Sequence, residues 1–146
     1  MKYPYRAVPF RPGVPKDPQH LPLLWARVRG PFGTRSLFLL VDSGAVETVL
    51  PLRALYAVGI TRPSGEKMEL AGVGGIVSGA DVFEGVKLEF GPNWRFGLTT
   101  RVVAHPDIQP RFTVLGRRDF FLRYFVGFDA GADVFSVSAP LRDRAK

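Results

Sequence analysis

Short apolar segments separated by glycine dominate the chain from residue 21 onward, and this spacing is what most constrains the fold. Residues 23–29 and 36–41 flank the sequence GPFG, in which Gly30 and Gly33 allow a tight turn, so together they predict a β-hairpin. Further strands are expected over 66–90 (two or three, interrupted by Gly72, Gly74, Gly75 and Gly79), 96–105 and 112–115, with a second hairpin over 126–138. So many short strands favour a mainly β fold built as a small closed or semi-closed barrel.

Two segments have helical patterns instead. In the first, Pro51 suits the opening position of a helix and Gly59 ends it, with three side chains sharing one face: Leu52, Leu55 and Tyr56. The second segment, GRRDFFLRYF at residues 116–125, predicts a short helix with three core-facing side chains: Phe121, Leu122 and Phe125. The fold is therefore expected to contain one or two short helices.

The domain organisation is simple. Residues 1–20 contain five prolines, which fix φ and remove hydrogen-bond donors, so this segment is expected to form an extended N-terminal arm. Residues 21–140 are long enough for one domain with its own core. Residues 141–146 form a basic C-terminal tail.

Composition narrows the function classes. The chain has no cysteine, which excludes disulfides, thiolate nucleophiles and thiolate zinc sites and fits a cytoplasmic protein. It has no apolar run long enough to span a membrane, and prolines stand where a signal peptide needs apolar residues. The net charge of +7 comes from scattered basic residues, so neither nucleic acid nor a membrane is an expected partner.

Three common kinds of site can be set aside. A dinucleotide fingerprint that started at Gly72 would need glycine where Val77 stands, and would need a helix after it. His20 and His105 are the only histidines, they lie far apart, and no G-x-S-x-G motif accompanies them. We therefore expect no serine-hydrolase triad, no metal site and no cofactor.

The carboxylate of Asp42 needs an explanation. It follows the apolar run FLLV directly, so it is expected to be partly buried, and burial of an unpaired carboxylate is costly. Ser43 adds a hydroxyl, and Gly44 lets backbone N–H groups approach the carboxylate. Asp-Ser-Gly alone is a common turn, but here it lies between a buried strand and VLP, which opens a helix.

In this setting LFLLVDSGAVETVLP resembles the active-site segment of the retropepsin-like aspartic proteases, of the single-lobe bacterial or cellular type. Thr48, Val49 and Leu50 fill the later positions of that family pattern. FTVLGRR resembles a second family segment that runs behind the catalytic loop, and residues 126–138 resemble the terminal hairpin. The glycine-rich segment between them resembles the substrate-binding flap, which would comprise Gly72, Val73, Gly74, Gly75 and Ile76.

The resemblance implies a single-lobe closed barrel and an aspartic endopeptidase that cleaves polypeptides. Asp42 would be the catalytic residue, and the residues supporting it would be Ser43, Gly44, Ala45, Leu115 and Gly116. Aspartic proteases use two carboxylates that share one proton, and this chain supplies one such motif. The resemblance therefore implies a homodimer, in which the hydroxyl of Ser43 bonds across the interface.

Two alternatives remain beside this interpretation. Asp129, in FDAGAD, offers a second Asp-x-Gly-Ala, but only 17 residues follow it, which leaves no room for a second lobe, and we interpret it as a turn residue. The chain could instead be a catalytically silent peptide-binding or interaction module with the same fold. Asp42-dependent cleavage of unfolded protein distinguishes the enzyme from this module.

Overall fold

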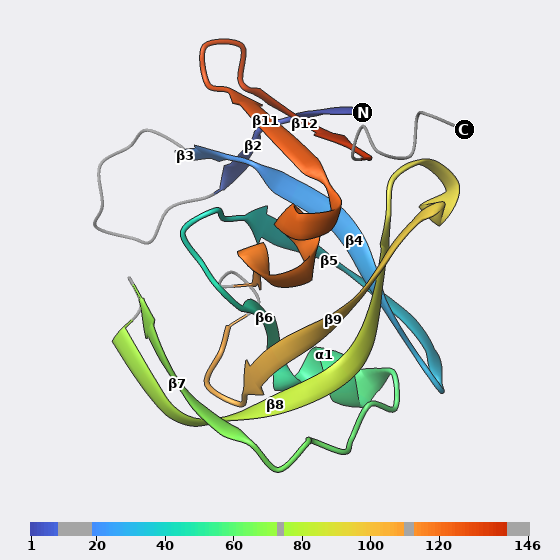
Figure 1. Cartoon of the computed structure of the whole chain (residues 1–146), viewed down its shortest axis with the longest axis vertical. Helices are drawn as coiled ribbons and strands as arrows, with labels where there is room; N and C mark the ends of the chain where they lie inside the picture. Colours follow the sequence, from blue (N-terminus) through green and yellow to red (C-terminus); the bar gives the residue numbers. More distant parts are fainter. Residues whose placement is uncertain (9–18, 73–74, 110–112, 140–146) are drawn as a thin grey trace.

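A computed structural model describes residues 1–8, 19–72, 75–109 and 113–139, and they form a mainly β protein (Figure 1). The strands are β1 (Lys2–Pro4), β2 (Arg6–Val8), β3 (Gln19–Leu21), β4 (Leu23–Gly30), β5 (Gly33–Val41), β6 (Thr48–Pro51), β7 (Lys67–Gly72), β8 (Gly75–Phe90), β9 (Phe96–His105), β10 (Val114–Leu115), β11 (Phe125–Asp129) and β12 (Val134–Ser138). The helical elements are α1 (Leu52–Ala57), the 3₁₀ turn η1 (Pro92–Trp94) and the irregular turn η3 (Arg117–Phe121). The expectation of a mainly β fold with short helices is confirmed.

The predicted first hairpin is present as β4 and β5. Gly30 pairs with Gly33, so two residues form the turn, and Gly33 has a φ of 122° that glycine adopts without strain. Alternate residues of β4 point inward, because Leu24, Ala26 and Val28 are buried. The same hairpin forms one wall of the core.

The largest sheet has the strand order β4-β5-β10-β6-β9-β8-β7, and β4 also pairs with β8. The two residues of β10 lie between β5 and β6, parallel to the first and antiparallel to the second. The chain must therefore pass over β10 as it goes from β5 to β6. That crossing segment is residues 42–47, which contains the Asp-Ser-Gly-Ala sequence.

Residues 66–90 form two strands, and the expected interruption at Gly79 is wrong. β8 runs unbroken through Gly79 and Gly85, whose φ angles of 70° and 69° are accommodated within the strand. The pairing of β8 with β9 shifts register between Phe83 and Val86, as in a β-bulge, which increases twist and bends a strand. One long strand can then pair with β7, β9 and β4 along its length.

The N-terminal residues belong partly to the folded body. β1 pairs with β12 in a three-stranded sheet of order β1-β12-β11, and β2 pairs with β3. The Met1 ammonium donates a hydrogen bond to the carbonyl oxygen of Val137 at 2.8 Å. Residues 9–18 of the predicted arm and the tail at 141–146 lie outside the described residues.

The helix expected after residue 51 is confirmed as α1, where Leu55 is fully buried and Tyr56 is about half exposed. Of the three side chains expected to face the core from residues 116–125, Phe121 is partly buried and packs against it, but the other two are wrong. Leu122 and Phe125 are exposed, whereas Phe120 and Tyr124 are buried against Phe90, with ring centroids 5.8 and 5.1 Å away.

Backbone geometry explains this shift. Asp119 has a φ of 66° and Arg118 has extended angles, so the segment is not a regular helix and its side chains leave the helical spacing. In the part of the chain that the structure describes, no helix has the length and apolar character needed to cross a membrane.

Candidate active site

Asp42 is held at the end of β5 by its backbone. Val41 is buried and pairs with Leu115 of β10, and the Asp42 N–H donates to the Leu115 carbonyl oxygen at 3.2 Å. The side chain of Asp42 is half-buried, and β5 and β10 fix where it emerges. Leu115, expected to support this position, is fully buried beneath it.

The turn after Asp42 is closed by its own carboxylate. The Gly44 N–H donates to Asp42 Oδ1 at 2.7 Å, which orients the carboxylate and is the hydrogen bond of an Asx turn. A Cβ atom at Gly44 would lie 3.1 Å from the same oxygen, a closer contact than most side chains make. Glycine therefore leaves room for this geometry. Ser43 is exposed, so its hydroxyl is available to a partner.

The rest of the crossing segment is bonded to the residues that follow β10. The Arg117 N–H donates to the Ala45 carbonyl oxygen at 2.8 Å, and the Arg118 N–H donates to that of Val46 at 2.9 Å. The Thr48 hydroxyl accepts a hydrogen bond from the Gly116 N–H at 3.2 Å. These bonds bring together the two segments whose resemblance to a protease was noted in the sequence.

Gly116 is required by close packing. A Cβ atom there would lie 2.3 Å from the Glu47 carbonyl oxygen and 2.8 Å from that of Val46, and both are backbone atoms. Gly116 has an ordinary extended conformation, with a φ of −84°, so glycine is needed for space and not for its torsion angles. The crossing segment and the chain after β10 thus pack backbone to backbone.

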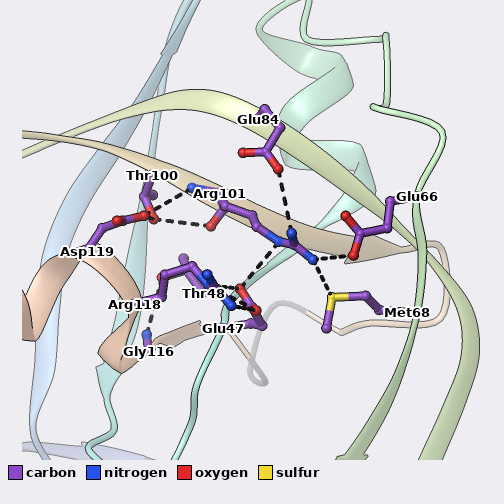
Figure 2. A network of polar contacts seen from close by, with 10 residues as sticks. All are labelled: Glu47, Thr48, Glu66, Met68, Glu84, Thr100, Arg101, Gly116, Arg118 and Asp119. Atoms are coloured by element: carbon purple, nitrogen blue, oxygen red, sulfur yellow. Dashed lines mark hydrogen bonds and ion pairs between the residues drawn. The ribbon is translucent and has the colours of Figure 1, made fainter.

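An ion pair between buried Glu47 and partly exposed Arg118, missed in the sequence, supports the same segment (Figure 2). The side chain of Glu47 is only 6% exposed, and Arg118 binds both of its oxygens, with Nε at 3.0 and 3.1 Å and Nη2 at 2.9 Å. This two-point geometry is the strong form of a charged pair. The partners are 71 residues apart, so no local pattern identifies them.

The residues expected to form the flap fall at the end of the β7–β8 hairpin. Its last described pair is Gly72 with Gly75, and the next residue, Ile76, is 69% exposed. Val73 and Gly74 lie outside the described residues. In Figure 1 the end of this hairpin where β7 finishes and β8 begins lies toward the left of the view, as does the segment that follows β5.

The other candidates occupy different places. Asp129 ends β11 in the smaller sheet, and its Oδ1 accepts a hydrogen bond from the Ala132 N–H at 3.1 Å, as a turn residue does. His20 pairs with Asp133 on the surface. Within residues 1–8, 19–72, 75–109 and 113–139, no three metal-ligating side chains come together.

Comparison with known proteins assigns no family. No protein-family model matches this chain, and no curated protein matches it significantly in sequence.

Proposed function

We propose that this chain is an aspartic endopeptidase of the retropepsin-like kind that hydrolyses peptide bonds as a homodimer. The observation that carries the proposal is the fixed position of Asp42. Its carboxylate is oriented by the Gly44 N–H at 2.7 Å, in a segment that crosses over β10 and is bonded to the residues after it. A surface turn without a function needs no such support.

The strand pairings support the finer statement about the fold. β4 pairs with both β5 and β8, so the ladder that runs through β5, β10, β6, β9 and β8 returns to β4. A ladder that returns to its first strand is the topology of a closed barrel, which leaves few free edges. We therefore propose a closed single-lobe barrel with the β7–β8 hairpin as its flap.

The chemistry requires a second copy. Two carboxylates held about 3 Å apart share one proton, because both cannot ionise at that distance. One Asp42 supplies one carboxylate, and a two-fold axis would bring the second from an identical chain. The exposed hydroxyl of Ser43 would then be free to bond across this axis.

The proposed reaction balances with water as the only co-reactant. The ionised Asp42 takes a proton from a water molecule, and the resulting hydroxide oxygen bonds to the peptide carbonyl carbon. The protonated Asp42 of the second copy donates its proton to the carbonyl oxygen, which gives a neutral tetrahedral intermediate. As the C–N bond breaks, the first Asp42, now protonated, donates its proton to the leaving nitrogen, and the second, now ionised, takes a proton from one hydroxyl of the intermediate, so the products are a carboxylic acid and an amine.

Replacement of the carboxylate tests this proposal. Asp42→Asn should lower cleavage of an unfolded protein substrate by about 10²–10⁴-fold between about pH 4 and pH 7, because it removes the general base. Its fold and its dimer, measured by circular dichroism and light scattering, should be unchanged. Asp129→Asn is the matched control and should retain activity, since that carboxylate only closes a turn.

Two results would contradict the proposal. If wild-type protein and Asp42→Asn give the same products, cleavage does not depend on Asp42, and the chain is a silent binding module. If Asp129→Asn is the inactive variant, the carboxylate has been assigned to the wrong residue.

A further inference from the structure

Arg101 connects three separate segments through one side chain. It projects from β9, its side chain is 18% exposed, and its guanidinium lies among three carboxylates (Figure 2). Nη2 donates to Glu66 Oε1 at 2.7 Å, Nε lies 3.7 Å from Glu47 Oε2, and Nη1 lies 3.7 Å from Glu84 Oε1. Among the described residues it is the side chain that reaches both Glu47 and Glu66.

Two of these carboxylates lie in the segments on which the proposed reaction depends. Glu47 belongs to the segment that carries Asp42. Glu66 directly precedes β7, the first strand of the proposed flap, and Arg101 Nη2 also lies 3.1 Å from the sulfur of Met68 within that strand. Arg101 therefore contacts the base of the hairpin and the active-site segment at once.

The two contacts differ in kind. The bond to Glu66 has the length of a charged hydrogen bond, and it is the largest cause that raises the pKa of Arg101 above its usual value. The contact with Glu47 is an ion pair without a hydrogen bond, because Arg101 Nε is buried and has no hydrogen-bond partner. Glu47 already has Arg118 on both oxygens, so the loss of Arg101 does not leave its charge unpaired.

The backbone of Arg101 is fixed from the other side. Asp119 Oδ2 accepts hydrogen bonds from the Thr100 hydroxyl at 2.9 Å and from the Arg101 N–H at 3.4 Å. Asp119 belongs to η3, the turn that follows Gly116. The guanidinium therefore extends from a backbone that the chain after β10 holds in place.

We propose that Arg101 is a positioning residue that sets the base of the β7–β8 hairpin relative to the segment carrying Asp42. The guanidinium is a rigid plane, so its hydrogen bond to Glu66 and its ion pair with Glu47 set a defined spacing between these two carboxylates. A hairpin that closes over a peptide must pivot where it leaves the body, and the contacts of Arg101 lie at that point. The consequence for catalysis rests on the proposed function, whereas the mechanical link does not.

Hydrogen exchange in the whole 146-residue chain without substrate tests the link. The informative variant is Glu66→Gln, because Glu66 is 51% exposed and its replacement does not threaten folding. Amides of the hairpin, 67–72 and 75–80, should exchange about threefold to tenfold faster, while those of β4 and β5 remain unchanged. Glu69→Gln is the matched control, since Glu69 is exposed on β7 and its side chain makes no hydrogen bond or ion pair with the described residues.

Arg101→Met should have the same effect on the hairpin and should also increase exchange over 43–48. Arg35→Met, an exposed arginine of β5, is its control. The double variant Arg101→Met with Glu66→Gln should exchange no faster in the hairpin than Arg101→Met alone, because both changes remove the same bond. If activity is present, KM should rise more than kcat falls.

Unchanged exchange in the hairpin of both variants would overturn the proposal, and so would equal acceleration in the two controls. Acceleration that extends equally to β4 and β5 would also overturn it, because it would mean a general loss of stability. The measurement needs no cleavage, so it gives its answer even if Asp42-dependent cleavage is absent. A failure of the link is thereby distinguishable from a failure of the proposed function.

Discussion

Gly116→Ala should damage both stability and activity through one defined contact. The added carbon would lie 2.3 Å from the Glu47 carbonyl oxygen, whereas ordinary contact begins at 3.4 Å, so the two must separate by about 1 Å. The nearest atoms belong to the backbone and cannot rotate away. The crossing segment that carries Asp42 must therefore move as a whole.

The size of the effect can be worked out from this displacement. Overpacking of this kind costs about 1–3 kcal/mol. The move also strains the two hydrogen bonds from the N–H groups of Arg117 and Arg118 to the crossing segment and the one from the Gly116 N–H to Thr48, each contributing about 0.5–1.5 kcal/mol. We expect the free energy of unfolding to fall by about 2–4 kcal/mol. A displacement of about 1 Å at a catalytic group lowers kcat/KM by about 10²-fold.

Urea denaturation and peptide cleavage measure the two effects. Gly97→Ala is the control, because its nearest neighbour, the Leu88 carbonyl oxygen, would lie 3.8 Å from the added carbon. Replacing glycine by alanine also stabilises a protein by restricting the unfolded chain, and Gly97→Ala corrects for this effect because it makes the same exchange. The reasoning is refuted if Gly116→Ala is as stable and as active as Gly97→Ala.

Two further predictions concern the scaffold. The hydrogen bond from Arg29, and to a smaller extent that from Arg27, holds the pKa of Glu89 below its usual value. The ionised Glu89 therefore stabilises the fold at pH values above its unfolded-state pKa, and this stabilisation is lost as the pH falls through its folded-state pKa. Glu89→Gln should therefore be less stable than wild type in urea at about pH 7, and the difference should vanish at about pH 2. Tyr124→Phe removes the hydrogen bond to the Gly97 carbonyl oxygen at 2.8 Å and should cost about 1 kcal/mol in the same assay. The first prediction is contradicted if the difference in unfolding free energy between Glu89→Gln and wild type is the same at every pH. The second is contradicted if Tyr124→Phe is as stable as wild type.

Turn residues and the alternation of apolar and polar residues predicted the hairpins and the helix whose form depends on neighbouring residues in the sequence. The hairpin of β4 and β5, the helix α1 and the hairpin of β11 and β12 were each predicted from turn residues and alternation, and each is present. Asp42 and Gly116 were singled out separately, and the structure brings their segments together through the bond from the Asp42 N–H to Leu115.

What the sequence could not predict depends on partners far away in the chain. The inward turn of Phe120 follows from the positive φ of Asp119, whose carboxylate bonds Thr100 on another strand. The burial of Glu47 depends on Arg118 and Arg101, and the unbroken course of β8 depends on three neighbouring strands. Each of these features is set by tertiary contacts that no window of sequence contains.

The central claim is that two copies of Asp42 form one active site, and mixing of subunits tests it most directly. Wild-type and Asp42→Asn chains would be unfolded together in equal amounts, refolded and assayed for cleavage. If both carboxylates are needed, only wild-type pairs are active. Random pairing makes these about one quarter of all dimers, so activity should be about one quarter of that of the same total amount of wild-type chain. About one half would remain if each chain cleaves with its own Asp42 alone, and that result would contradict the account.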